Sequence, residues 1–149
     1  IDMFNVLRKG DKNICAAISN ESKEATQYLD HDFSPVNSLE KKFSDTVSKE
    51  ISFNRHLERK IHTYKFSQII EAQNIKDTQI DFINIDAEAH DFEVLEGIDL
   101  NIYKAKLICI EMLDFENKIN EKKFQHYLTK YNYNLIKIIG PNGIFELKN

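Results

Sequence analysis

The chain has 149 residues, the length of one ordinary domain that can bury a core of its own. Hydrophobic residues make up 42% and charged residues 30%, which is a globular composition and excludes a disordered chain. Twenty basic against 24 acidic residues give a net charge of -4, which argues against a nucleic-acid partner. Because we find neither a membrane-length apolar run nor a signal peptide, we expect a cytoplasmic protein without membrane contact.

The chain opens without a methionine, and Met3, Phe4 and Leu7 follow at helical spacing. Gly10 is a plausible end for this helix. Since no capping residue precedes the helix, we expect the sequence to begin inside a helix of a longer protein.

Two short strands are predicted next, at 13–18 and at 25–29. The polar stretch 31–60 is long for a loop in a compact domain. It fits a lid, an excursion with a helix such as 47–57, or a disordered stretch. A helix face then runs from Phe66 to about Asn74.

The second half of the chain shows the clearest pattern. The run 80–85 is nearly continuous in apolar residues, which predicts a strand covered on both faces. A helix is expected after it, with Phe92, Leu95 and Ile98 on one side and Gly97 closing it. A buried strand over 106–110, an amphipathic helix over 124–131 and a β-hairpin over 134–147 follow. This order predicts an α/β fold with a mostly parallel sheet and a C-terminal antiparallel hairpin.

The two cysteines, Cys15 and Cys109, each lie within an apolar run. We expect two buried thiols of a cytosolic protein and neither a disulfide nor a metal pair.

Chemistry is expected where the strands end, because open parallel sheets bind ligands at the carboxyl ends of their strands. Asp86, Glu88, His90 and Asp91 follow the strand 80–85, and Glu111 ends the strand 106–110. A carboxylate there can orient a cationic ligand, bind a metal, or take a proton from a hydroxyl nucleophile. The imidazole of His90 is an alternative base.

Structural explanations compete with these roles. Asp91 and Glu93 are typical of residues that cap a helix, and His90 is typical of a surface residue at a helix start. Asp86 still belongs to the strand end, which favours a functional role. The spacing of the four residues Asp86, Glu88, His90 and Asp91 matches no standard metal loop, so no metal site is predicted.

The segment from Asp81 to Asp99 resembles the FkbM family of S-adenosylmethionine-dependent methyltransferases. That family carries a strand ending in Asp-x-Glu-Gly and a helix ending in Val-Leu-x-Gly, which correspond here to Asp86–Ala89 and Val94–Gly97. The segments 105–111 and 16–20 are similar to further strands of the family. The resemblance covers nearly the whole chain.

The resemblance implies a Rossmann-like seven-stranded sheet, S-adenosylmethionine as cofactor, and O-methylation of a sugar or another hydroxylated metabolite. By position, Asp86 would lie beside the methionine end of the cofactor and the acceptor hydroxyl, while Ser19 and Asn20 would lie near the adenine. The expected catalytic residues are Asp86, Glu88 and His90, and the expected partner is a small-molecule or glycan acceptor.

The chain departs from the family pattern in two places. Ala89 stands where the family has glycine, which removes freedom for a positive φ. The first strand, the Gly-rich cofactor loop and the second strand have no counterpart. We therefore expect residues 1–149 to be a single, N-terminally truncated domain with a partial Rossmann-like sheet, and 31–60 to be an insertion or lid. Exposed sheet edges would favour self-association.

Two other functions stay open at this stage. One is a non-catalytic protein-binding module with a degenerate methyltransferase fold. The other is a metal-dependent hydrolase that uses Asp86, Glu88 and His90. Binding of S-adenosylmethionine would separate the methyltransferase from both.

Overall fold

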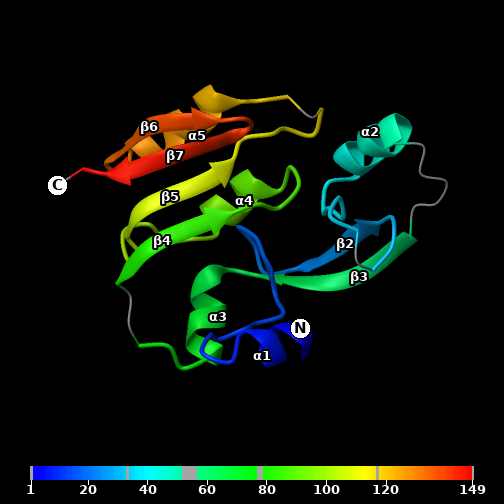
Figure 1. Cartoon of the computed structure of the whole chain (residues 1–149), viewed down its shortest axis with the longest axis horizontal. Coiled ribbons are helices and arrows are strands. Elements are labelled where there is room, and N and C mark those ends of the chain that lie inside the picture. The colour runs from blue at the N-terminus through cyan, green and yellow to red at the C-terminus, as the bar shows by residue number, and fades with distance from the viewer. Residues whose placement is uncertain (1, 33, 52–56, 77–78, 117, 149) are drawn as a thin grey trace.

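The structure, a computed structural model, describes residues 2–32, 34–51, 57–76, 79–116 and 118–148. Its strands form two separate sheets, one of three strands and one of four (Figure 1). The four-stranded sheet comes from the second half of the chain and the three-stranded sheet from the first.

The three-stranded sheet has the order β1-β3-β2. The strands are β1 (Ala17–Ile18), β2 (Glu24–Leu29) and β3 (Leu57–Tyr64). β3 pairs in parallel with β1 and antiparallel with β2, so it lies in the middle. The prediction of a strand over 25–29 is confirmed, whereas only the last two residues of the strand predicted over 13–18 pair with a neighbour.

The four-stranded sheet has the order β4-β5-β7-β6. Its strands are β4 (Ile80–Ile85), β5 (Ala105–Glu111), β6 (Tyr133–Ile139) and β7 (Asn142–Leu147). β4 and β5 are parallel, while the hairpin β6–β7 adds to β5 in antiparallel fashion through β7. The α/β class and the hairpin are confirmed. The mostly parallel, Rossmann-like sheet is not confirmed, because both sheets are mixed.

The described helices are α1 (Asp2–Leu7), α2 (Lys41–Ile51), α3 (Phe66–Ala72), α4 (Asp91–Glu96) and α5 (Glu121–Thr129). No helix of the described segments is long and apolar enough to cross a membrane. The helices predicted near the start of the chain, after Phe66, before Gly97 and after Phe124 are confirmed.

The main core lies between the four-stranded sheet and the helices packed on one of its faces (Figure 1). α4 contributes Leu95, and α5 contributes Phe124 and Leu128. β5 and β7 contribute Ile108 and Phe145 from facing positions in the sheet. These side chains are buried completely or nearly so, and this packing holds the start of α4 firmly against the tip of β4.

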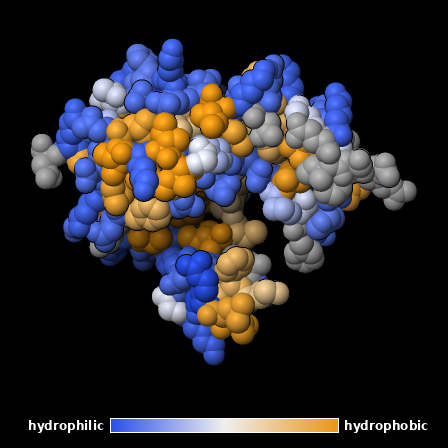
Figure 2. All heavy atoms as spheres, turned by 45° about the horizontal axis from the view of Figure 1, so that its top comes forward, coloured by the Kyte–Doolittle hydropathy of each residue, from blue (hydrophilic) through white to orange (hydrophobic). Residues whose placement is uncertain are grey.

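The other face of β4 is open to solvent. Phe82 is 54% exposed, so the expectation that both faces of 80–85 are covered is wrong. β4 is an edge strand, and its alternating residues place Ile83 and Ile85 on the packed face and Phe82 on the opposite one. Figure 2 shows hydrophobic side chains also gathering at the surface over the half of the molecule that holds this sheet.

The polar stretch 31–60 contains regular structure. Its helix runs over Lys41–Ile51 and not over 47–57, and its last residues belong to β3. The end of the predicted helix, 52–56, lies outside the described residues. β3 gives little signal in the sequence, because most of its residues are exposed and charges interrupt its alternation.

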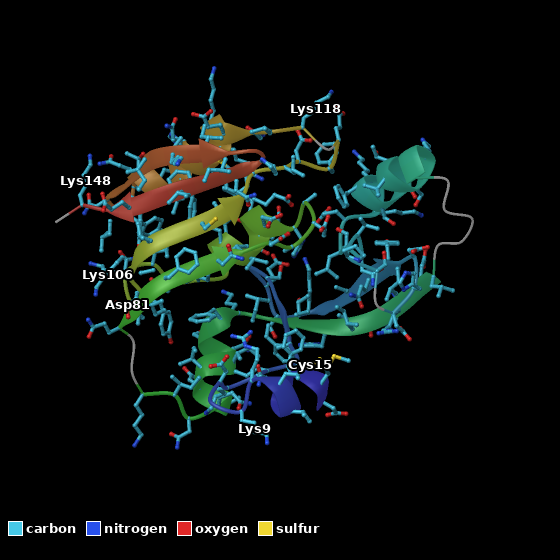
Figure 3. The ribbon with its side chains drawn as sticks, in the orientation of Figure 1. Lys9, Cys15, Asp81, Lys106, Lys118 and Lys148 are labelled. Carbon is cyan, nitrogen blue, oxygen red and sulfur yellow. The ribbon has the colours of Figure 1, made fainter. Side chains whose placement is uncertain are left out.

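Cys15 is exposed, which corrects the expectation of a buried thiol. It precedes β1, on the N-terminal segment near α1 (Figure 3), where the chain is not yet paired in a sheet. Cys109 is half-buried within β5, and both cysteines are free thiols. The segment around Cys15 is therefore less buried than its apolar composition predicts.

Candidate functional site

The site forms where β4 ends and the chain turns into α4. Asp86 is the first residue after β4 and is exposed, while Asp91 opens α4 and is 0% exposed. Oδ1 of Asp91 accepts a hydrogen bond from the backbone N–H of Ala87 at 2.8 Å. Oδ2 of Asp91 has no partner among the described residues. Asp91 therefore connects the start of α4 to the turn after β4, and this bond fixes the position of the tip of β4.

The same turn contains two residues with a positive φ, Glu88 at 53° and Ala89 at 69°. Side chains other than that of glycine rarely adopt this region, which costs about 1–2 kcal/mol per residue. Ala89 packs against Phe43 and Val47 of α2. The backbone thus keeps at Ala89 the conformation for which glycine is suited, although the residue is alanine.

Several carboxyl groups lie close enough at this edge to affect one another. Burial, followed by the charges of Asp86 and Asp91, raises the pKa of Glu88 to about 7. Burial, followed by the charges of Asp91, Asp86 and Glu88, raises the pKa of Glu111 to about 7. Burial raises the pKa of Asp91 to about 6, against the hydrogen bond from Ala87. This crowding of acidic groups favours a cationic ligand.

His90 has both ring nitrogens engaged. It is 9% exposed, and Nδ1 lies 2.8 Å from Oε1 of Glu40 while Nε2 lies 3.0 Å from the hydroxyl of Ser19. The structure thus brings together two predicted site residues, Ser19 and His90, that are 71 positions apart. Glu40 was not among the predicted site residues, because it lies in the polar stretch and carries no recognisable motif.

Asn20 is fixed from the far end of α4. Its Nδ2 donates to Oε2 of Glu96 at 2.9 Å. The backbone N–H of the neighbouring Ser19 donates to the carbonyl oxygen of Tyr64, the last residue of β3, at 2.9 Å. Of the two residues predicted to lie near the cofactor, Asn20 is therefore held to α4 and Ser19 to β3.

Two cavities adjoin these residues. The first, of about 330 Å³, is lined by Asp86, Ala87 and His90 together with Ala17 and Ile18 of β1. The ends of β1 and β4 thus face one hollow, as expected for strand ends that bind a ligand.

The second cavity, of about 370 Å³, is lined by Ser19, Asn20, Glu40, His90 and Glu93. His90 lines both cavities and therefore separates the predicted catalytic carboxylate from the predicted cofactor-binding pair.

The polar stretch is tied to the site by Ser38. Its hydroxyl donates to the backbone carbonyl of Glu88 at 2.6 Å and accepts the backbone N–H of Glu40 at 2.9 Å. Asn37, Ser38 and Leu39 also line the first cavity. This segment therefore contributes directly to the walls of the site.

The fold and the site define an α/β protein with an acidic strand tip facing a cavity. A family model described as the methyltransferase FkbM domain matches residues 4–135, so the chain belongs to the FkbM methyltransferase family. No curated protein and no solved structure matches the chain.

Proposed function

We propose that this chain carries the site of an S-adenosylmethionine-dependent methyltransferase that methylates a hydroxyl of a sugar or another hydroxylated metabolite. The observation that supports it best is the position of Asp86. Asp86 stands at the tip of β4 and lines a cavity of about 330 Å³ that the end of β1 also lines. Membership in the FkbM family supports the same reaction class.

The residues present fit a cofactor of this charge. S-adenosylmethionine carries a positive sulfonium, a positive ammonium and a negative carboxylate group, so its net charge is positive. Asp86, Glu88, Asp91 and Glu111 lie near one another and form no ion pair with a lysine or arginine among the described residues. The buried Oδ2 of Asp91 and the buried Oε2 of Glu111 have no hydrogen-bond partner there either. Such a cluster stabilises a cation and disfavours an anion.

The reaction is an in-line displacement at the methyl carbon. A bound cofactor would supply its methyl group to the acceptor oxygen, with the carbon–sulfur bond broken and a neutral thioether left. The acceptor hydroxyl must lose its proton, and we assign Asp86 as the group that takes it. Much of the rate would then come from holding the acceptor in line, because positioning removes most of the entropic barrier.

The other predicted residues support this arrangement. His90, held by Glu40 and Ser19, positions the turn after β4 between the two cavities. Glu88 adds negative charge beside Asp86. Ser19 and Asn20 line the second cavity, which we assign to the adenine side. The acceptor is a small molecule or glycan, the protein acts in the cytoplasm, and the open edge of β4 allows self-association.

The test is methyl transfer by the full-length protein from radiolabelled S-adenosylmethionine to a panel of hydroxylated acceptors, with cofactor binding measured by calorimetry. Asp86→Asn should lower turnover by about 100-fold or more, the usual effect of losing a general base. Its melting temperature should stay close to that of the parent.

Asp81→Asn is the matched control for that variant. Asp81 lies on the same strand at the opposite end and is exposed, and it pairs with Lys106 at 2.6 Å (Figure 3). Its loss should leave turnover unchanged. An Asp86→Asn variant with the parent's rate would remove Asp86 from the mechanism. Absence of cofactor binding would favour the protein-binding module, and hydrolysis abolished by a chelator would favour the hydrolase.

A further inference from the structure

Beside the acidic strand tip lies a second group of ligating side chains. Nδ1 of His90 and one carboxylate oxygen each from Glu40 and Glu93 all lie within 4.8 Å of one another. The separations from Nδ1 are 2.8 Å to Glu40 and 4.0 Å to Glu93. Because zinc bonds to nitrogen and oxygen are about 2.0–2.2 Å long, ligand atoms of one ion lie about 3–4 Å apart. The two separations from Nδ1 lie just below this spacing and at its upper limit, so small side-chain rotations would bring the three atoms onto one cation.

The hydrogen bonds of His90 are compatible with Nδ1 as a metal ligand. The hydroxyl of Ser19 has an acceptor in Oδ1 of Asn20 at 3.3 Å, so it can donate there and accept from Nε2–H of His90 at 3.0 Å. In that arrangement Nδ1 carries a lone pair directed at a carboxylate oxygen only 2.8 Å away. Two acceptors at this distance are joined either by a proton or by a bound cation. Metal-bound histidines are oriented in the same way, by a hydrogen bond on the other ring nitrogen.

The local charges favour a divalent cation in that position. Glu40 and Glu93 form no ion pair with a lysine or arginine in the part of the chain that the structure describes. Lys23 lines the same cavity but pairs with Glu21 at 2.5 Å. One proton on His90 would leave the group with a net negative charge, whereas a divalent ion balances both carboxylates. We infer that Glu40, His90 and Glu93 form a binding site for a divalent transition-metal ion such as Zn²⁺.

The site would be open on one side. All three residues line the cavity of about 370 Å³, so a fourth ligand such as water can reach an ion bound there. The ion would also join the segment before α2, which carries Glu40, to α4, which carries Glu93. The ligands are a different set from the carboxylates at the strand tip, although they line the cavity assigned above to the adenine side and include His90. Binding of Zn²⁺ alone therefore tests this inference without reference to methyl transfer.

The experiment is calorimetric titration of the chelator-treated, full-length protein with Zn²⁺ alone, followed by thermal unfolding with and without the ion. We expect one bound ion per chain and a higher melting temperature, because an ion that binds only the folded state stabilises it. Titration with Co²⁺ should give visible absorption bands from nitrogen and oxygen ligands. Glu93→Gln should weaken Zn²⁺ binding at least tenfold, because it removes one ligand and leaves the contact between Glu40 and His90.

Glu71→Gln is the control, since Glu71 is an exposed carboxylate on α3, away from the three ligands. It should bind Zn²⁺ as the parent does. Ser19→Ala should also weaken binding, because His90 loses the partner that orients Nδ1. The inference is overturned if the parent binds no Zn²⁺, which would leave a hydrogen bond between His90 and Glu40 as the reason for their contact. It is overturned equally if Glu93→Gln binds with the affinity of the parent, which would place the ion elsewhere.

Discussion

Gly97 lies directly against the backbone of Ser19. A Cβ built on Gly97 would stand 2.2 Å from the carbonyl oxygen of Ser19 and 2.7 Å from its carbonyl carbon. Only glycine lets the end of α4 approach the chain after β1 this closely. The contact is made by backbone atoms, so no side-chain movement can relieve it. This approach sets the distance between the strand ends that line the candidate site.

Gly97→Ala should therefore destabilise the protein by about 2–3 kcal/mol, at the upper end of the usual cost of overpacking, because backbone must move. Chemical denaturation measures the change. Gly10→Ala is the matched control, since a Cβ there would meet nothing within 4 Å. Equal stabilities of the two variants would show that α4 and the segment after β1 can separate without cost.

The carboxyl group of Glu111 predicts a pH dependence. Burial and the neighbouring carboxylates raise its pKa from 4.5 to about 7 in the folded state. The stabilisation that the neutral group provides is thus complete below about pH 4.5 and is lost as the pH rises through about 7. Glu111→Gln keeps this position neutral at every pH.

We expect Glu111→Gln to be more stable than the parent at about pH 8 by about 1 kcal/mol, a value reduced for solvent screening of a half-buried group. The difference should vanish near pH 4. Denaturation curves across this range measure it, and Glu71→Gln, at an exposed position, should show no such trend. A constant difference between Glu111→Gln and the parent would mean that neither burial nor the neighbouring carboxylates raise the pKa of Glu111.

Ser38 predicts how the polar stretch supports the site. Ser38→Ala removes the donor to the carbonyl of Glu88 and the acceptor for the N–H of Glu40, so it should cost about 1–3 kcal/mol. Hydrogen exchange should become faster in the turn 86–90. The control is Ser48→Ala, because the hydroxyl of Ser48 donates to the carbonyl oxygen of Ser44 within α2 and makes no other hydrogen bond in the described part of the chain. An unchanged rate of hydrogen exchange in the turn 86–90 would show that the polar stretch does not stabilise the site.

The sequence predicted the elements whose pattern is local. The apolar run of β4, the helical spacing of Phe124 and Leu128, and the turn of the β6–β7 hairpin each depend on neighbouring residues alone. β3 was missed because it is paired on both sides and yet mostly exposed, so its residues lack the alternation of a half-buried strand. The exposure of Phe82 depends on which face of the sheet the helices cover, and the sequence of one strand does not predict that face.

The placement of the candidate site's residues could be predicted to a similar extent, whereas their roles stay predictions. The position of Asp86 and Glu111 at strand ends follows from the strands themselves, and their neighbourhood follows once β4 and β5 are parallel. The partner of His90 could not be predicted, because Glu40 reaches it across 50 residues of chain through the fold of the polar stretch. The positive φ of Ala89 is the reverse case: the family pattern indicated glycine there, and the turn keeps that geometry with alanine.

The hydroxyl of Tyr133 predicts the last effect, in the core. It donates to the carbonyl oxygen of Ala105 at 2.7 Å, and both residues are fully buried. Tyr133→Phe leaves that carbonyl without its donor and should cost about 1–2 kcal/mol, because water cannot replace the bond. Tyr28→Phe, at a half-buried position whose hydroxyl has no hydrogen-bond partner among the described residues, should cost less than about 0.5 kcal/mol. Thermal or chemical unfolding compares the two, and equal costs would mean that the bond between β6 and the start of β5 contributes nothing to stability.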